Sequence, residues 1–330
     1  MAVPPLLRVR DLSTHYVGFR GTRVVKAVDG VSFSVEPGET FGLVGESGCG
    51  KTTTCHSIVR LLAPSARIVG GSIELEGEDL VKKSQTEMRR IRGRRIATIL
   101  QDPMASLDPL FTIYDQVAEP AYYHRALRGR TLRQRVTELL GAVRIPSPEQ
   151  RMRDFPHQMS GGMRQRIVGA IAQAGGPRVI IADEPTTNLD VTIQLQYLNL
   201  LKDLQRTTGV ALIFVTHNLG IVAKMCDTVA VMYAGKIVEM QSVRGLFARP
   251  RHPYTRALLD SIPKLGVKEP LYGIPGQPPD LTALPVGCSF HPRCRHAMDR
   301  CRSEEPWLHD LGDGASARCW LPIEEAASRG

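Results

Sequence analysis

The stretch that most constrains this chain is GESGCGKT, residues 45–52. It follows a short apolar segment, Phe41 to Val44, and it precedes a helical pattern that we expect to stop at Pro64. The glycines allow backbone N–H groups to turn inward onto phosphate oxygens, and the start of a helix adds a partial positive charge. Strand, glycine-rich loop and helix in this order predict a phosphate-binding loop (P-loop) in an α/β fold.

The side chains of this loop have predicted roles in binding a nucleotide. Lys51 is expected to hold the β and γ phosphates, and Thr52 is expected to bind magnesium. Cys49 stands at the start of the predicted helix, where the pKa of a thiol tends to be lowered, so we expect its alkylation to block nucleotide binding. The other loop positions assigned to the nucleotide are Gly45, Ser47, Gly48, Gly50 and Thr53.

A second segment, RVIIADEPTTNLD at residues 178–190, predicts the other half of a nucleotide site. A buried strand from Val179 to Ala182 would place Asp183 and Glu184 at its carboxyl end. Asp183 suits a magnesium shell, and Glu184 suits polarising the attacking water. Such a pair can also be an ordinary solvated turn, but open α/β sheets bind ligands outside the carboxyl ends of their strands, which favours a functional role.

A third segment, DFPHQMSGGMRQRIVGAIAQA at residues 154–174, predicts a helix that begins at a capping serine. Ser160 would be the N-cap, and Gly161 and Gly162 would leave room for a close approach. A lone S-G-G is commonly only a helix cap, so this motif gains its meaning from the two others.

Taken together, the three motifs resemble those of the ATP-binding subunits of ABC transporters. GESGCGKT resembles the Walker A motif, MSGGM the family signature and VIIADEP Walker B, and TTNLD, which ends at Asp190, resembles the D-loop. Met159 stands where leucine is common in the signature, a swap of similar volume. The resemblance implies a nucleotide-binding domain over residues 1–250, with a RecA-like core, a β subdomain and a helical signature subdomain at about residues 103–176.

The resemblance also assigns roles to three further residues. Gln101 matches the Q-loop glutamine, which contacts magnesium and couples to the membrane partner, and His217 matches the switch histidine at the γ-phosphate. Tyr16 stands where the family places an aromatic ring against adenine, although one aromatic on an early strand is more often core packing. The implied catalytic residues are Glu184, His217 and Gln101, the implied magnesium ligands are Thr52, Gln101 and Asp183, and the implied nucleotide contacts also include Ser160, Gly161, Gly162 and Asp190.

The remaining residues, 251–330, are expected to form a small loop-rich extension that binds a metal or cluster. HPYTRALL at residues 252–259 and GCSFHPRC at residues 287–294 are similar to the C-terminal extension of dipeptide and oligopeptide importers. Four thiols are enough to enclose a metal or a cluster, but their spacing lacks the paired C-x-x-C of zinc ribbons. The resemblance implies a [4Fe–4S] cluster, with Zn²⁺, free thiols or a disulfide as alternatives, held by Cys288, Cys294, Cys301 and Cys319.

Composition narrows the classes of partner. The formal net charge is +9, but the basic runs, such as MRRIRGRR at residues 88–95, do not interleave aromatic residues as a nucleic-acid platform would. We therefore expect a solvated basic face and no nucleic acid, and a face lying near anionic lipid would fit the same residues. Apolar runs are strand-sized and the N-terminus has no signal-peptide pattern, so we expect a protein on the cytoplasmic side of the membrane.

The sequence thus predicts an ATPase, using ATP and Mg²⁺, that energises import of di- and oligopeptides from the cytoplasmic face of the cell membrane. Its expected partners are a second ABC ATPase subunit, either a paralogue or a copy of itself, two transmembrane permease subunits and, through the complex, an extracytoplasmic peptide-binding protein. The alternative is a soluble ABC ATPase without transport, of the phosphonate-metabolism or DNA-repair type.

Overall fold

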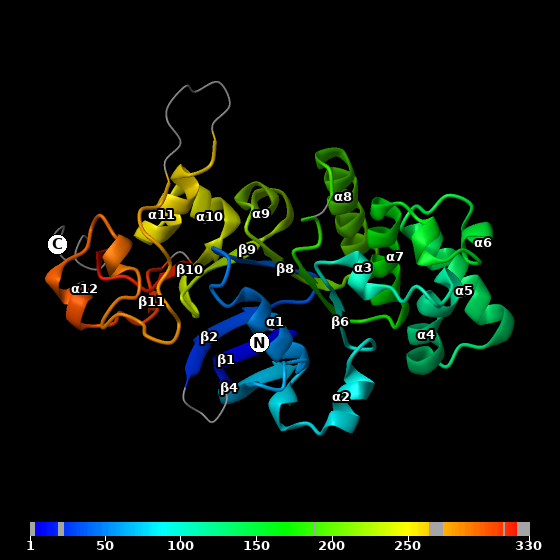
Figure 1. The fold of residues 1–330 in the computed structure, drawn as a ribbon, viewed down its shortest axis with the longest axis horizontal. Coiled ribbons are helices and arrows are strands. Elements are labelled where there is room, and N and C mark those ends of the chain that lie inside the picture. Colours follow the sequence, from blue (N-terminus) through cyan, green and yellow to red (C-terminus); the bar gives the residue numbers. More distant parts are fainter. Residues whose placement is uncertain (1–3, 19–22, 188, 264–272, 313, 322–330) are drawn as a thin grey trace. The chain divides into compact units, whose positions relative to one another are not determined.

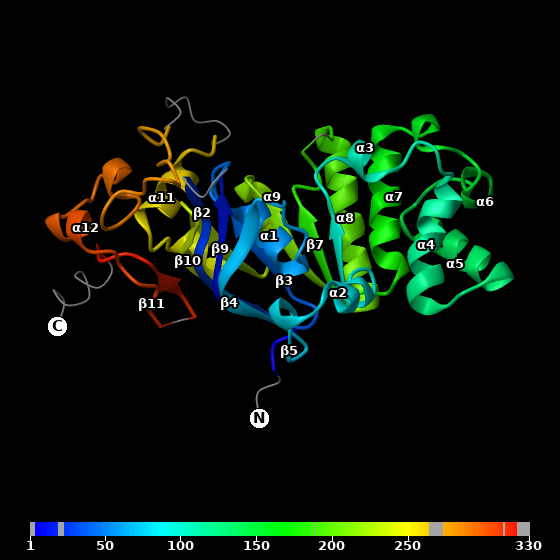
Figure 2. The same ribbon diagram turned by 60° about the horizontal axis from the view of Figure 1, so that its bottom comes forward.

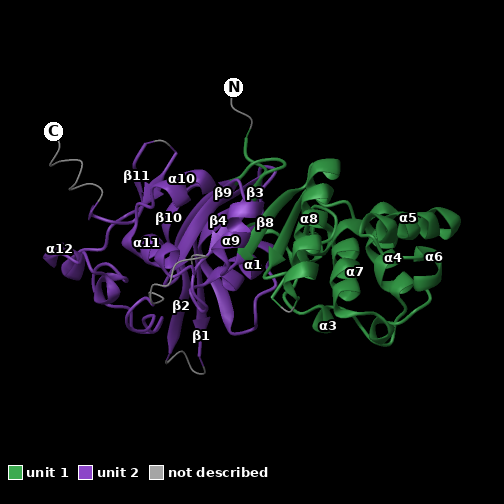
Figure 3. Ribbon diagram, turned by 90° about the horizontal axis from the view of Figure 1, so that it is seen from above, with its two compact units in different colours: residues 1–6, 35–40, 82–215 green, residues 7–34, 41–81, 216–330 purple. Residues whose placement is uncertain are grey.

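The computed structural model describes residues 4–18, 23–187, 189–263, 273–312 and 314–321. The chain forms two compact units, which Figure 3 colours separately. The P-loop unit contains residues 7–34, 41–81 and 216–330, and the helical unit contains residues 1–6, 35–40 and 82–215. The domain limits predicted from the sequence, near residue 250 and at about residues 103–176, stay predictions.

The P-loop unit contains an antiparallel sheet with the strand order β2-β1-β4-β5. Strand β1 pairs with β4 so that Leu7 lies opposite Leu75 and Tyr16 opposite Ala66. Buried and exposed residues alternate along much of β1, as expected for a strand with one face in the core. The bounds of these strands are β1 Leu7–Val17, β2 Val24–Val35, β4 Ala66–Leu75 and β5 Glu78–Asp79.

A second set of strands in this unit has the order β11-β12-β10-β9-β3. Strands β3 (Thr40–Val44) and β9 (Thr228–Tyr233) are parallel, whereas β9 and β10 (Lys236–Ser242) form an antiparallel hairpin. The hairpin turns at Ala234 and Gly235, both with positive φ (48° and 82°), as a type I′ turn requires. The C-terminal extension adds β12 (Ser316–Ala317) to β10, and β11 (His309–Asp310) pairs with β12.

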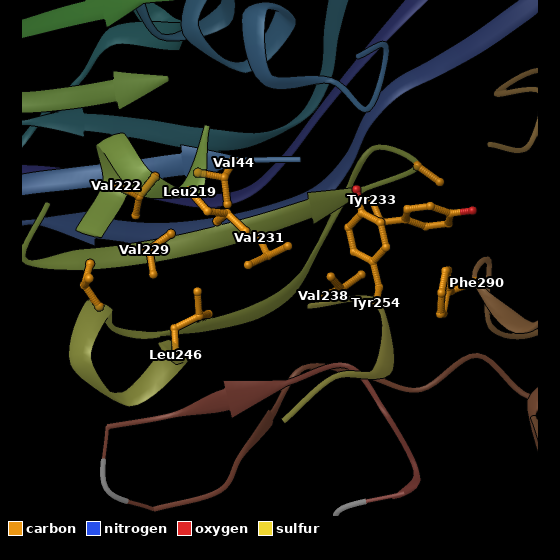
Figure 4. Packing of buried hydrophobic residues seen from close by; sticks show 12 residues of the cluster. Val44, Leu219, Val222, Val229, Val231, Tyr233, Val238, Leu246, Tyr254 and Phe290 are labelled. Atoms are coloured by element: carbon orange, nitrogen blue, oxygen red, sulfur yellow. The ribbon is translucent and has the colours of Figure 1, made fainter. Parts of the chain in front are cut away.

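The core of this unit joins β9 and β10 to the extension. Figure 4 shows aliphatic side chains of the strands beside the rings of Tyr233, Tyr254 and Phe290, which all lie in one buried cluster. Each such side chain contributes about 1.5–3 kcal/mol when fully buried. The helices of this unit are α1 Lys51–Val59, α9 Leu219–Met225, α10 Val243–Ala248, α11 Pro253–Asp260 and α12 Asp299–Ser303, with 3₁₀ turns at Leu80–Lys82 and His291–Arg293.

The helix after the P-loop is shorter than the sequence predicts. We expected it to stop at Pro64, but α1 ends at Val59. Arg60 takes a left-handed conformation, with φ 53°, and its N–H reaches the carbonyls of His56 and Ser57. This cap satisfies carbonyls of the last turn, so the helix ends before the proline can act on it.

The helical unit combines three parallel strands with a group of helices, shown in Figures 1 and 2. The strand order is β8-β7-β6, with Val179 of β7 opposite both Ile96 of β6 and Ala211 of β8. Helix α4 packs on α5 and α7, and α7 also contacts β6 and α8. The bounds are β6 Ile96–Ile99, β7 Val179–Asp183, β8 Ala211–Thr216, α2 Gln85–Ile91, α3 Pro103–Ser106, α4 Ile113–Arg125, α5 Gly129–Ala142, α6 Pro148–Arg151, α7 Gly161–Ala174 and α8 Val191–Thr208, with a 3₁₀ turn at Pro156–Gln158.

Among the described helices, none combines the length and the apolar character that crossing a membrane requires.

Candidate nucleotide-binding site

The backbone of the P-loop takes conformations that require glycine at its two ends. Gly45 follows the fully buried strand β3 with φ 153°, and Gly50 precedes α1 with φ 110°. A Cβ on Gly45 would collide with the carbonyl of Met232, and a Cβ on Gly50 would collide with the carbonyl of Ala27. The backbones of β2 and β9 therefore lie in direct contact with the two glycines and fix the path of the loop.

The loop presents its open side to solvent and holds its lysine inward. Ser47, Gly48 and Thr52 are exposed, whereas Lys51 is buried. The Lys51 ammonium donates hydrogen bonds to the carbonyls of Gly45 (2.9 Å) and Glu46 (3.0 Å). A cation across a glycine-rich loop at the start of a helix is the arrangement that binds phosphate groups.

Strand β1 brings Tyr16 to the first turn of α1. The Tyr16 hydroxyl lies 3.3 Å from Oγ1 of Thr53, within hydrogen-bonding distance. The structure thus places Tyr16 beside the P-loop helix, and its stacking on adenine stays a prediction.

The expectation of a lowered pKa for Cys49 was wrong. Cys49 is buried, and burial raises the pKa of its thiol despite the opposing effect of the Lys51 ammonium. Desolvation of the thiolate outweighs the favourable charge at the helix start. The thiol is therefore protonated at neutral pH and acts as a small packing group under the loop.

The helical unit brings together two of the predicted catalytic side chains. Glu184 directly follows β7 with φ 45°, a left-handed conformation that is unusual for this residue type, and its N–H donates to the carbonyl of Val215 (3.0 Å). The Glu184 carboxylate accepts hydrogen bonds from Nε2 of Gln101 (3.3 Å) and from the Thr187 hydroxyl (3.1 Å). Backbone strain of this kind is concentrated at functional sites. Asp183 ends β7 as a buried carboxylate.

The signature segment and the D-loop residue both start helices. The Ser160 hydroxyl accepts a hydrogen bond from the N–H of Met163 (3.3 Å), which confirms the predicted N-cap. Asp190 caps α8 by accepting from the N–H groups of Thr192 and Ile193, both at 3.0 Å. A Cβ on Gly162 would lie 2.8 Å from the Ile193 side chain, so this glycine allows α7 and α8 to approach. Asn188 of the D-loop lies outside the described residues.

The structure also locates the switch histidine and the three predicted magnesium ligands within the two units. His217 is exposed directly after β8. Thr52 belongs to the P-loop unit, whereas Gln101 and Asp183 belong to the helical unit. The magnesium shell that these three residues were expected to share stays a prediction.

The four cysteines of the extension line one small cavity, together with His252, Phe290 and Trp320. Cys288 and Cys319 are largely enclosed, and burial raises the pKa of Cys288 to about 11 and that of Cys319 to about 12. None of the seven cysteines, which all lie in the described residues, forms a disulfide in this structure, so the disulfide alternative is not supported. Four thiols around one cavity are the right donors for a metal or cluster. However, within the described ranges no three His, Cys, Asp or Glu side chains are placed to hold a metal ion. The expected cluster is therefore not confirmed.

Sequence reasoning missed two side chains that contact the P-loop from within its own unit. The Tyr254 hydroxyl accepts a hydrogen bond from the N–H of Glu46 (2.9 Å), and Arg293 donates to the Glu46 carboxylate at 2.7 and 3.0 Å. One signal in the sequence could have indicated these contacts. Glu46 is an acidic residue inside a loop that is predicted to bind phosphate, so its carboxylate needs a nearby cation.

The fold and the site define a P-loop ATPase, and comparisons with known proteins place it in a family. The family model described as "ABC transporter" matches residues 28–187, and the model "Oligopeptide/dipeptide transporter, C-terminal region" matches residues 238–301. The chain therefore belongs to the ABC transporter family as an ATPase subunit.

Similar proteins include two curated relatives and a solved structure. The chain is 49% identical to the "Probable peptide ABC transporter ATP-binding protein y4tR" of Sinorhizobium fredii, over 97% of this chain and 96% of that protein. It is 46% identical to the dipeptide transport ATP-binding protein DppD of Bacillus subtilis, over 97% of this chain and 96% of that protein. The dimeric ATP-binding cassette MJ0796 in a post-hydrolysis state, bound to ADP and Pi, superposes with a TM-score of 0.64 at 26% identity, over 72% of this chain and 99% of that one.

Because burial raises the Cys49 pKa, this thiol should react slowly with iodoacetamide at pH 7. We expect peptide-resolved mass spectrometry to show labelling about tenfold or more slower in the folded protein than in the urea-unfolded protein. The rate should begin to rise at a higher pH in the folded protein than in the urea-unfolded protein, because burial raises the pKa of this thiol. Labelling at pH 7 that is equally fast in both states would contradict this assignment.

Proposed function

We propose that this ATPase energises the import of di- and oligopeptides as a peripheral subunit on the cytoplasmic face of the cell membrane. The observation that carries the proposal is the similarity to peptide transport proteins over 97% of the chain. This similarity includes a match to the model of the C-terminal region of oligopeptide and dipeptide transporters. A soluble ABC ATPase without transport is not favoured, because these relatives match over 97% of the chain.

The site residues divide the work of hydrolysis. In the proposal, Lys51 and the backbone N–H groups of the P-loop hold the β and γ phosphates. Glu184 polarises the attacking water, and Gln101 orients the Glu184 carboxylate through the 3.3 Å hydrogen bond. Thr52 and Asp183 offer oxygen ligands that suit Mg²⁺, which neutralises phosphate charge when it is bound.

The proposal requires two ATPase subunits, arranged so that the signature helix of one faces the nucleotide on the other. The dimeric state of MJ0796 supports this arrangement. Ser160 and Gly161 support it too, because they are exposed at the start of α7 and leave that helix end open to a phosphate group. The second subunit is a copy of this chain or a paralogue.

A groove in the helical unit suits the docking of a permease. The groove has a volume of about 560 Å³ and is lined mainly by residues of α4 and the loop before it, among them Phe111, Asp115, Glu119 and Tyr123. Phe111 and Tyr123 are 53% and 71% exposed. Aromatic side chains beside carboxylates suit a short amphipathic helix with basic residues, and the proposal assigns that helix to a cytoplasmic loop of a permease subunit. A peptide-binding protein outside the membrane completes the complex.

For the extension, we propose that the four cysteines hold an iron–sulfur cluster of the [4Fe–4S] type, with Zn²⁺ as the alternative. Their gathering around one cavity supports this idea. A bound cation would also stabilise the thiolate forms that burial disfavours in Cys288 and Cys319.

Replacement of the proposed base tests the chemistry. Glu184→Gln should reduce ATP turnover by roughly 10² to 10⁴ and leave ATP binding intact, because the amide keeps the shape but cannot accept a proton from water. Glu149→Gln changes an exposed glutamate of α6 and serves as the matched control, with normal turnover expected. Normal phosphate release by Glu184→Gln would refute the role of Glu184.

Truncation in the groove tests the docking surface. Phe111→Ala should weaken binding to membranes that contain the cognate permeases by about tenfold, because it removes an exposed aromatic anchor. The ATP affinity of the purified subunit should not change. Val69→Ala, at a residue of β4 that is 54% exposed, is the control. Unchanged membrane binding and unchanged peptide uptake would exclude this groove as the docking surface.

Metal analysis after oxygen-free purification tests the cysteine site. A bound cluster predicts about four iron atoms per chain and a brown colour, and both should be lost in Cys301→Ser. Stoichiometric zinc without iron would select the alternative, and a chain free of both metals would refute the site.

A further inference from the structure

The P-loop of this chain contains an acidic residue in its second position. A carboxylate at Glu46 would oppose the binding of a triphosphate unless its charge were neutralised. Glu46 is only partly exposed, with 27% of its side chain accessible. The loop therefore needs a permanent cation close to this carboxylate.

Arg293 supplies that cation from the four-cysteine extension. Its Nη1 and Nη2 donate to the two oxygens of the Glu46 carboxylate at 2.7 and 3.0 Å, the paired geometry that makes arginine–carboxylate bonds strong. The Arg293 side chain is 5% exposed, so water screens this pair poorly.

The position of Arg293 is fixed by its own neighbours. Its Nε donates to the carbonyl of Pro275 (2.8 Å), and Nη1 also reaches the Tyr233 hydroxyl (3.3 Å). Arg293 ends the short 3₁₀ turn His291–Arg293, whose first N–H donates to the carbonyl of Cys288. Arg293 thus lies between two cysteines of the extension, one of which follows it directly.

A second contact from the extension holds the backbone at the same residue. The Tyr254 hydroxyl accepts the Glu46 N–H, and His252 caps the helix that carries Tyr254 by accepting its N–H at Nδ1 (3.0 Å). The rings of Tyr233, Tyr254 and Phe290 pack with centroids 4.7 to 5.3 Å apart (Figure 4). The side chain and the backbone of Glu46 are therefore both held by this part of the unit.

Glu46 in turn contacts the lysine that binds phosphate. The Lys51 ammonium donates to the Glu46 carbonyl at 3.0 Å, so a displacement of this residue would also displace an acceptor of Lys51. The chain of contacts runs from the cysteine loop through Arg293 and Glu46 to Lys51.

We propose that Arg293 is a positioning residue for ATP binding, which neutralises Glu46 and fixes the P-loop from the four-cysteine extension. The proposal rests on the ATP binding of this family and not on peptide transport or on the occupant of the cysteine site. Its test is therefore independent of those proposals.

The test is a cycle of variants of the full chain, with the dissociation constant of MgATP as the readout. Arg293→Met should raise this constant and the KM for ATP about tenfold and leave kcat within about twofold, because the unpaired Glu46 carboxylate repels the phosphates. Glu46→Gln should bind ATP at least as tightly as the unchanged protein. The double variant should return to within about twofold of the unchanged protein, since no charge then needs neutralising.

Arg318→Met is the matched control. Arg318 also lies in the extension, donates to the carbonyls of Ile237 (3.2 Å) and Pro306 (3.1 Å), and adjoins Cys319. Among the described residues, its hydrogen bonds and ion pairs do not include a P-loop residue. It should leave ATP affinity unchanged. If Arg293→Met does not fold, Arg293→Lys is compared with and without Glu46→Gln. We then expect a smaller loss of ATP affinity in Arg293→Lys and the same recovery of affinity in the double variant.

Three results would overturn the proposal. The first is normal ATP affinity in Arg293→Met or, where that variant does not fold, in Arg293→Lys. The second is a loss of ATP affinity that Glu46→Gln does not rescue. The third is an equal loss of ATP affinity in Arg318→Met. The last two would show that the arginine acts only through the general stability of the extension.

Discussion

The contact of two glycines with neighbouring backbone carbonyls is the constraint on which the nucleotide site depends. Gly45 and Gly50 lie so close to the carbonyls of Met232 and Ala27 that no side chain fits, and both have backbone conformations that other residues rarely adopt. The loop between them is therefore shaped by the strands around it. Because that shape is set by packing, the N–H groups and Lys51 need little rearrangement to receive phosphate.

The same principle extends from the loop to the extension. In a typical P-loop the phosphate-binding groups come from one strand and one helix, whereas here Tyr254 and Arg293 hold the second residue of the loop from more than 200 positions further along the chain. The extension shares a buried aromatic cluster with β9 and adds a strand to β10. It is therefore part of the packing that supports the nucleotide site, and one of its cysteines, Cys294, directly follows Arg293.

In the helical unit, the orientation of Glu184 depends on strand pairing. Glu184 is held in a left-handed conformation by the register of β7 with β8, through the hydrogen bond from its N–H to Val215. This bond directs its side chain to Gln101 and Thr187. The strained backbone thus gives the Glu184 side chain a fixed orientation, which suits the role that we propose for it in aligning a water molecule.

The sequence by itself determined the features that depend on local chemistry. The P-loop, the carboxylates at the end of β7 and the Ser160 cap each follow from a few adjacent residues, because glycine freedom, helix capping and strand ends are local properties. Only the tertiary structure decided the early end of α1 at Arg60, the raised pKa of Cys49 and the pairing of Glu46 with Arg293. These features depend on burial and on contacts between distant segments, and neither is encoded in the spacing of neighbouring residues.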